Sequence, residues 1–166
     1  SAILICGIYV DLNPIRAGEA RVPEQARHTS AFDRIEGRRM RRGAATLQSL
    51  RQVSDSIHAE ASTSATMPPD GWLCELTLAS GLDANVPGCL PSTTPWRASD
   101  KGIVSVSLDE YLQLLDWTGR KLASGKRGSI PAELAAILER LEILAPAWLD
   151  AIEHFDKKFG KIVAGV

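Results

Sequence analysis

Apolar side chains recur at helical spacing at the start of the chain. Ile5, Ile8 and Leu12 follow one another at intervals of three or four residues, which predicts a helix over residues 1–12. Pro14 has no backbone N–H to donate, so we expect this helix to close next to it. The same three side chains are predicted to form the apolar face of the helix.

A second helix is predicted over residues 29–36, where Thr29 or Ser30 provides an N-cap. The sequence after it is first rich in arginine and then rich in serine, threonine and alanine. Because few large aliphatic side chains occur there, it can bury little apolar surface, and we interpret residues 54–71 as a linker.

The sequence beyond this linker predicts a mostly helical module over residues 72–166. Short apolar stretches separated by glycine and proline predict short strands or extended segments over residues 72–106. A Ser-x-x-Glu capping box at residues 107–110 predicts the start of a regular helix, and further helices are predicted from residues 130 and 146. The expected fold class is therefore mainly α. The apolar face of the capped helix comprises Leu108, Tyr111, Leu112, Leu115 and Leu122.

Charge is distributed unevenly along the chain. The 166 residues contain 19 Lys+Arg and 20 Asp+Glu, yet residues 1–53 alone hold nine arginines, no lysine and five carboxylates. An all-arginine block suits bidentate contacts with phosphates. A run of charged residues equally forms a solvated protein face, so charge alone leaves both interpretations open.

Cysteine usage and hydropathy favour a cytoplasmic protein without a membrane anchor. The three cysteines are widely spaced and no Cys-x-x-Cys pair occurs, which indicates free thiols in a reducing compartment and gives no zinc signature. The longest apolar run, residues 2–10, is well short of the roughly 20 residues that a membrane-spanning helix needs.

The candidate chemistry centres on Tyr9 and Asn13 in the string GIYVDLNPIRAG, residues 7–18. Four residues apart on a helix, the two side chains share a face. A tyrosine hydroxyl attacks phosphorus when the phosphate is polarised, and an amide oxygen can ligate a hard cation that polarises it. The same spacing fits a plainer interpretation, in which Tyr9 fills the core and Asn13 with Pro14 closes the helix.

The string YVDLNPIRAG, residues 9–18, resembles the C-terminal signature of the REP-associated tyrosine transposases, which are single-tyrosine members of the HUH superfamily. Residues 21–35 and 107–131 also resemble segments of these proteins. The resemblance implies cleavage and transfer of single-stranded DNA in transposition, through a 5′-phosphotyrosine intermediate. It implies that Tyr9 is the nucleophile and that Asn13 helps to hold a divalent metal, Mg²⁺ or Mn²⁺.

The family's metal-binding histidines are missing from the chain, since no His-x-His occurs. We therefore expect residues 1–53 to be the C-terminal end of an α+β, ferredoxin-like catalytic domain whose sheet precedes Ser1. The fragment alone is expected to hold no metal and to be inactive. The expected partners are single-stranded or hairpin DNA, the N-terminal half of its own domain and a second copy of the chain.

The arginine-rich segment is the predicted nucleic-acid contact, with a solvated face as the alternative. A non-catalytic DNA-binding or interaction module is the alternative function. Residues 119–128 are basic, but they lack the spacing of a phosphate-binding loop and are interpreted as a turn between helices. Arg16 is expected near the DNA backbone, and the remaining candidates are Arg34, Arg38, Arg39, Arg41 and Arg42.

Overall fold

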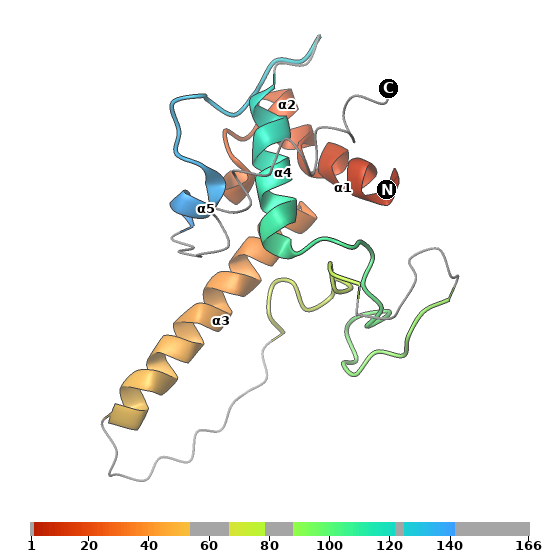
Figure 1. The fold of residues 1–166 in the computed structure, drawn as a ribbon, viewed down its shortest axis with the longest axis vertical. Helices are drawn as coiled ribbons and strands as arrows, with labels where there is room; N and C mark the ends of the chain where they lie inside the picture. Colours follow the sequence, from red (N-terminus) through yellow and green to blue (C-terminus); the bar gives the residue numbers. More distant parts are fainter. Residues whose placement is uncertain (1, 54–66, 79–87, 122–124, 142–166) are drawn as a thin grey trace.

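The computed structural model describes residues 2–53, 67–78, 88–121 and 125–141. This part of the chain is mainly α, as predicted, and its only strand-like pairing is a single parallel bridge between Thr77 and Val104. The predicted helix from residue 146 and most of the predicted linker lie outside the described residues. The elements in chain order are α1 (Ala2–Asp11), α2 (Asn13–Ala17), the 3-10 turn η1 (Pro23–Gln25), α3 (Ser30–Val53), α4 (Leu108–Arg120) and α5 (Ile137–Arg140) (Figure 1).

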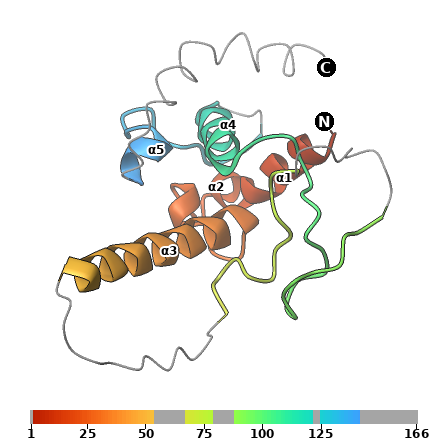
Figure 2. The ribbon, with the colours of Figure 1, turned by 60° about the horizontal axis from the view of Figure 1, so that its bottom comes forward.

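Helix α4 packs against α1 and the first turns of α3, and these elements share one hydrophobic core (Figures 1 and 2). Leu12 of α1's C-terminal end and Leu112 and Leu115 of α4 are almost completely buried in it. Buried residues from both sides of the predicted linker therefore belong to one core in the described part of the chain. The capped helix completes the N-terminal segment because the apolar faces of both are buried in the same core.

The inward face of α1 differs from the predicted one by one position. Leu4, Ile8 and Leu12 are buried, whereas Ile5 is 50% exposed. The predicted apolar face is thus wrong at Ile5, whereas Ile8 and Leu12 are buried in the core that α4 shares. The helix is apolar on both sides, so choosing the buried side from spacing alone was ambiguous. Its outward side carries Ile3, Ile5, Tyr9 and Val10, each at least half exposed.

Helix α3 begins where the sequence predicts and continues much further. The Thr29 hydroxyl caps it by accepting a hydrogen bond from the backbone N–H of Phe32 at 3.2 Å. The helix then runs to Val53, well past the predicted end at residue 36, because no proline interrupts it and alanine and arginine favour helix. It projects away from the other helices beyond its first turns (Figure 2). The arginine-rich segment is therefore helical.

A buried carboxylate, that of Asp11, joins the start of α3 and the first turn of α4 to the end of α1. It is 1% exposed. It accepts hydrogen bonds from the backbone N–H groups of Ser30 and Ala31 at 2.9 and 3.1 Å, and from the Ser30 hydroxyl at 2.8 Å. The Tyr111 hydroxyl donates a fourth at 2.6 Å. The negative charge thus lies at the positive end of the α3 dipole and is fully hydrogen-bonded.

The described parts of the segment before α4, residues 72–78 and 88–106, pair in extended form at the Thr77–Val104 bridge and otherwise consist mostly of turns, bends and irregular backbone. Leu76 and Val104 enter the core from the two sides of the bridge. Their backbones are joined by hydrogen bonds from the N–H groups of Val104 to Leu76 O at 3.0 Å and of Leu78 to Val104 O at 2.7 Å.

The predicted capping box starts α4, with the Ser107 hydroxyl and the Glu110 backbone paired as expected. The helix predicted from residue 130 is wrong in extent, since between residues 130 and 141, where the structure describes it, α-helix is found only at Ile137–Arg140. The guanidinium of Arg120 explains the difference. It donates hydrogen bonds to the carbonyl oxygens of Pro131, Ala132 and Ala135 at 3.3, 3.2 and 2.9 Å. These bonds hold the segment against α4 in a non-helical conformation.

Replacing Asp11 with Asn is expected to lower the free energy of unfolding by about 2–4 kcal/mol, because the amide removes the charge and sets an N–H₂ group among donors. The control is Asp109→Asn, which breaks a half-exposed ion pair with Arg38 and is expected to cost less than about 1 kcal/mol. Urea unfolding of both variants measures the difference. Equal losses would contradict the role given to Asp11.

Tyr111→Phe is expected to change how stability depends on alkaline pH. Burial, assisted by the Asp11 charge, raises the pKa of Tyr111 in the folded chain above the unfolded value of about 10. The unfolded chain then releases the proton first, so the free energy of unfolding of the wild type falls above pH 10. The fall should exceed that of the variant by about 1.4 kcal/mol per pH unit, measured by urea unfolding from pH 8 to 11. Parallel curves would contradict the burial argument.

Candidate active site

Tyr9 lies on the outward side of α1, and its side chain is 57% exposed. The interpretation in which Tyr9 fills the core is therefore wrong for the described residues. The second tyrosine, Tyr111, makes the contrast plain, because it is 3% exposed and its hydroxyl is bound to Asp11. Of the two phenols, only that of Tyr9 is open to a large substrate.

Asn13 lies one helical turn beyond Tyr9, as predicted. The helical course continues through Leu12, whose φ and ψ are −85° and −10°. The backbone N–H of Leu12 donates to Ile8 O at 3.0 Å, and that of Arg16 donates to Leu12 O at 2.9 Å. Tyr9 and Asn13 therefore share the outward face, and both are exposed.

The described residues do not by themselves fit a metal site at this face. No group of three or more His, Cys, Asp and Glu side chains with metal-binding geometry occurs among them. The adjacent carboxylate, Asp11, is buried and holds four hydrogen bonds. Asn13 offers a single amide oxygen, so its predicted role needs further ligands, and no metal-dependent step is derived from this chain.

Arg16 is half-buried beneath the end of α4. Its Nη2 donates to the carbonyl oxygen of Thr118 at 3.2 Å, and its Nη1 is buried without a hydrogen-bond partner among the described residues. The guanidinium therefore fastens α2 to α4. Its predicted contact with the DNA backbone stays a prediction.

The arginines of α3 are largely engaged with other parts of the protein. Arg34 is 7% exposed and donates to Cys74 O at 2.8 Å, and burial lowers its pKa against the opposing effect of nearby carboxylates such as Asp70. Arg34 is therefore engaged inside the protein, and its predicted contact with nucleic acid stays a prediction. Its neighbours along the helix keep exposed surface.

The exposed arginines of α3 mostly face carboxylates. Arg41 makes a bidentate pair with Asp70 at 2.8 and 2.7 Å, which raises the pKa of Arg41. The other contacts are Arg38 with Asp109, Arg39 with Glu36 at 2.5 Å, and Arg42 with the carbonyl of Leu141 at 3.0 Å. Three of the four predicted phosphate contacts thus have their charge compensated within the protein, and their predicted role stays a prediction.

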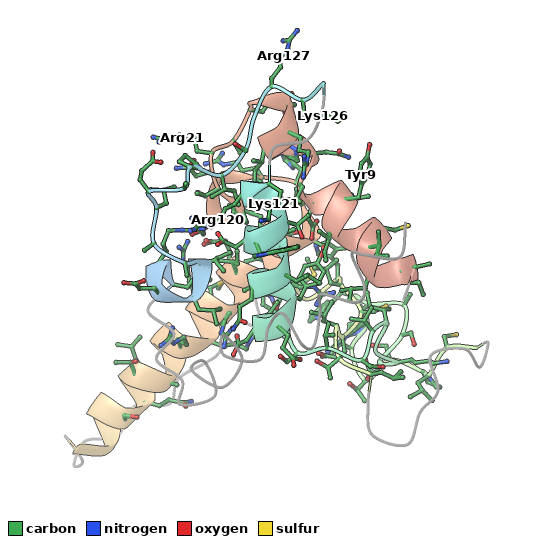
Figure 3. All side chains as sticks on the ribbon, turned by 45° about the horizontal axis from the view of Figure 1, so that its top comes forward. Tyr9, Arg21, Arg120, Lys121, Lys126 and Arg127 are labelled. Atoms are coloured by element: carbon green, nitrogen blue, oxygen red, sulfur yellow. The ribbon has the colours of Figure 1, made fainter. Side chains whose placement is uncertain are left out.

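A second group of basic side chains was not among the predicted contacts. Lys121, Lys126 and Arg127 are exposed and lie with Tyr9 in the upper half of the molecule as Figure 3 is drawn. The Nζ of Lys121 is 5.0 Å from the centroid of the Trp117 ring, a cation–π contact. The sequence signal was the basic stretch at residues 119–128, which was read only as a turn.

The turn that carries Lys126 and Arg127 is anchored on α2. The backbone N–H groups of Arg127 and Gly128 donate to the carbonyl oxygen of Arg16 at 3.2 and 3.3 Å. A methyl group placed on Gly128 would lie 2.0 Å from the carbonyl oxygen of Ile15, so glycine is required for this approach. The turn is thereby held at the end of the helical segment that bears Tyr9 and Asn13.

No helix of the described residues has both the length and the apolar character required to cross a membrane. Comparison of the chain with protein-family models, curated proteins and solved structures gives no match.

Gly128→Ala is expected to lower the free energy of unfolding by about 1–3 kcal/mol, because the added methyl group meets backbone that cannot move aside. Gly43→Ala is the matched control. A methyl group at Gly43 meets no atom within 4 Å, so this change in α3 is expected to stabilise by about 0.5–1 kcal/mol. Thermal or urea unfolding shows whether each variant is less or more stable than the wild type. A neutral Gly128→Ala would contradict the close approach.

Proposed function

We propose that this chain is the C-terminal part of a transposase-like enzyme that cuts single-stranded DNA and transfers it through a 5′-phosphotyrosine intermediate. The resemblance of residues 9–18 to the REP-associated tyrosine transposases supplies the reaction. In this proposal the protein acts in the cytoplasm, Tyr9 is the nucleophile and Asn13 assists at a divalent metal in the complete enzyme.

The observation that carries the proposal is the exposure of Tyr9. Its phenol is 57% exposed on a helix whose other side is packed into the core. A tyrosine retained for packing is expected to be buried like Tyr111. An exposed hydroxyl on a rigid helix is instead suited to meet a phosphodiester, which is too large to enter a protein core.

The proposed step conserves the number of phosphodiester bonds. The Tyr9 hydroxyl oxygen attacks the phosphorus and loses its proton. A bond forms between this oxygen and phosphorus, and the bond from phosphorus to the 3′ oxygen breaks. The 3′ oxygen takes up a proton and leaves as a hydroxyl. Because one ester replaces another, a 3′-hydroxyl can later attack the phosphotyrosine, and the strand is rejoined without an external energy source.

The rest of the proposed catalytic domain is a ferredoxin-like sheet with a His-x-His pair, which this chain does not contain. The outward side of α1 supports such a partner. Ile3, Ile5 and Val10 are each at least half exposed beside Tyr9, and a helix that is apolar on both sides is typical of one covered on both sides. Burying this apolar surface would stabilise the contact by about 25 cal/mol per Å².

The test is Tyr9→Phe in the complete protein, incubated with a labelled single-stranded hairpin DNA and Mg²⁺ or Mn²⁺. A covalent protein–DNA adduct is expected from the wild type on a denaturing gel, and its complete loss from the variant, since phenylalanine has no nucleophilic oxygen. Tyr111→Phe is the matched control, because it removes a buried phenol. It is expected to keep the adduct at temperatures where it remains folded.

An adduct that persists in Tyr9→Phe would overturn the assignment of the nucleophile. If the wild type binds the DNA but forms no adduct with either metal, the proposed enzymatic function is wrong, and a non-catalytic DNA-binding module is favoured. Trapping the adduct also allows its phosphorylated residue to be located by mass spectrometry, which checks Tyr9 directly.

A further inference from the structure

We infer that Lys126 and Arg127 bind the phosphate backbone of the DNA strand that reaches Tyr9, in place of the arginines of α3. The inference rests on the proposed action on single-stranded DNA, and it assigns that substrate a contact surface. The turn that carries these two residues is called the basic turn below. Three observations support the inference: the charge of the basic turn, its position relative to Tyr9 and its anchoring on α2.

The charge of the basic turn is uncompensated. Among the described residues, the side chains of Lys126 and Arg127 make no hydrogen bond or ion pair, and both are exposed. By contrast, Arg38, Arg39 and Arg41 of α3 each face a carboxylate. A phosphate that approaches α3 must compete with these carboxylates. A phosphate that approaches the basic turn meets no carboxylate paired with Lys126 or Arg127 among the described residues, so the attraction is larger there.

The basic turn lies at the end of the helical segment that carries the proposed nucleophile. Its backbone is bound to the carbonyl of Arg16, which is seven residues beyond Tyr9. The two points lie on α1 and α2, which follow one another with only Leu12 between them, and at a helical rise of about 1.5 Å per residue seven residues span about 10 Å along this course. A strand can therefore contact both at once. Figure 3 shows Lys126 and Arg127 at the same end of the molecule as Tyr9.

The basic turn is also fixed in place before any strand binds. Two N–H groups from Arg127 and Gly128 share the Arg16 carbonyl, and Gly128 allows the two backbones to touch. The guanidinium of the same Arg16 donates to Thr118 O, so α2, α4 and the basic turn are connected through one residue. A phosphate contact on such a support loses less conformational entropy than one on a free loop.

The test compares two double variants that each remove two positive charges from the 166-residue chain. Lys126→Ala with Arg127→Ala removes the basic turn's charges, and Arg39→Ala with Arg41→Ala removes two from α3. Binding to a labelled single-stranded DNA of mixed sequence is measured by fluorescence anisotropy over a series of salt concentrations. Circular dichroism checks that both variants keep the wild-type helix content.

The basic-turn variant is expected to bind more weakly and to lower the slope of log affinity against log salt by about 1.4, the value for two lost phosphate contacts on a single strand. The α3 variant is expected to keep a slope close to that of the wild type. A charge-preserving exchange, Lys126→Arg with Arg127→Lys, is expected to retain the wild-type slope.

An unchanged slope in the basic-turn variant, or an equal or larger loss in the α3 variant, would overturn the inference. The Tyr9→Phe chain separates this result from the proposed function, because it lacks the nucleophile but keeps both sets of charges. It is expected to bind DNA like the wild type. If the chain binds DNA through these charges but the complete protein forms no adduct, the inference about the basic turn stands and the proposed enzymatic function is wrong.

Discussion

The carboxylate of Asp11 holds the described fold together, because three helices meet at its two oxygens. It ends α1, caps the first two backbone N–H groups of α3 and accepts the hydroxyl of Tyr111 from α4. A buried charge is costly unless every lone pair is used, and here four donors converge on it. All four hydrogen bonds form only when α1, α3 and α4 are correctly placed relative to one another. This placement also decides which side of α1 faces outward, and it therefore exposes Tyr9.

The string YVDLNPIRAG thus combines two tasks in ten residues. Asp11, Leu12 and Ile15 are buried and serve the fold, whereas Tyr9 and Asn13 are exposed and serve the proposed chemistry. The two sets lie on different faces because the helical repeat of about 3.6 residues returns Tyr9 and Asn13, four positions apart, to one side and Asp11, Leu12 and Ile15 to the other. A substitution at Asp11 would consequently impair the proposed site without touching a substrate. Unfolding measurements on the same variants are needed before any activity loss is assigned to chemistry.

Local signals in the sequence predicted local structure well. The Thr29 cap, the capping box at residues 107–110 and the one-turn spacing of Tyr9 and Asn13 all depend on neighbours within four residues. Long-range partners were not predictable from the sequence. Asp11 contacts residues 19 to 100 positions away, and Arg120 prevents a predicted helix by binding carbonyls of a later turn. The arginine-rich segment was identified correctly as basic, but its carboxylate partners, such as Asp70 and Asp109, become neighbours only on folding.

The anchoring of the basic turn on Arg16 has a geometric consequence for the proposed reaction. Backbone hydrogen bonds from Leu12 to Ile8 and from Arg16 to Leu12 join α1 to α2, so the separation between Tyr9 and the basic turn is set by hydrogen-bonded backbone and stays nearly constant. If a strand is bound at Lys126 and Arg127, the phosphodiester that reaches Tyr9 lies a fixed number of nucleotides from the bound phosphates. The cut would then be positioned by measurement along the backbone, which needs no recognition of the bases at the cut itself.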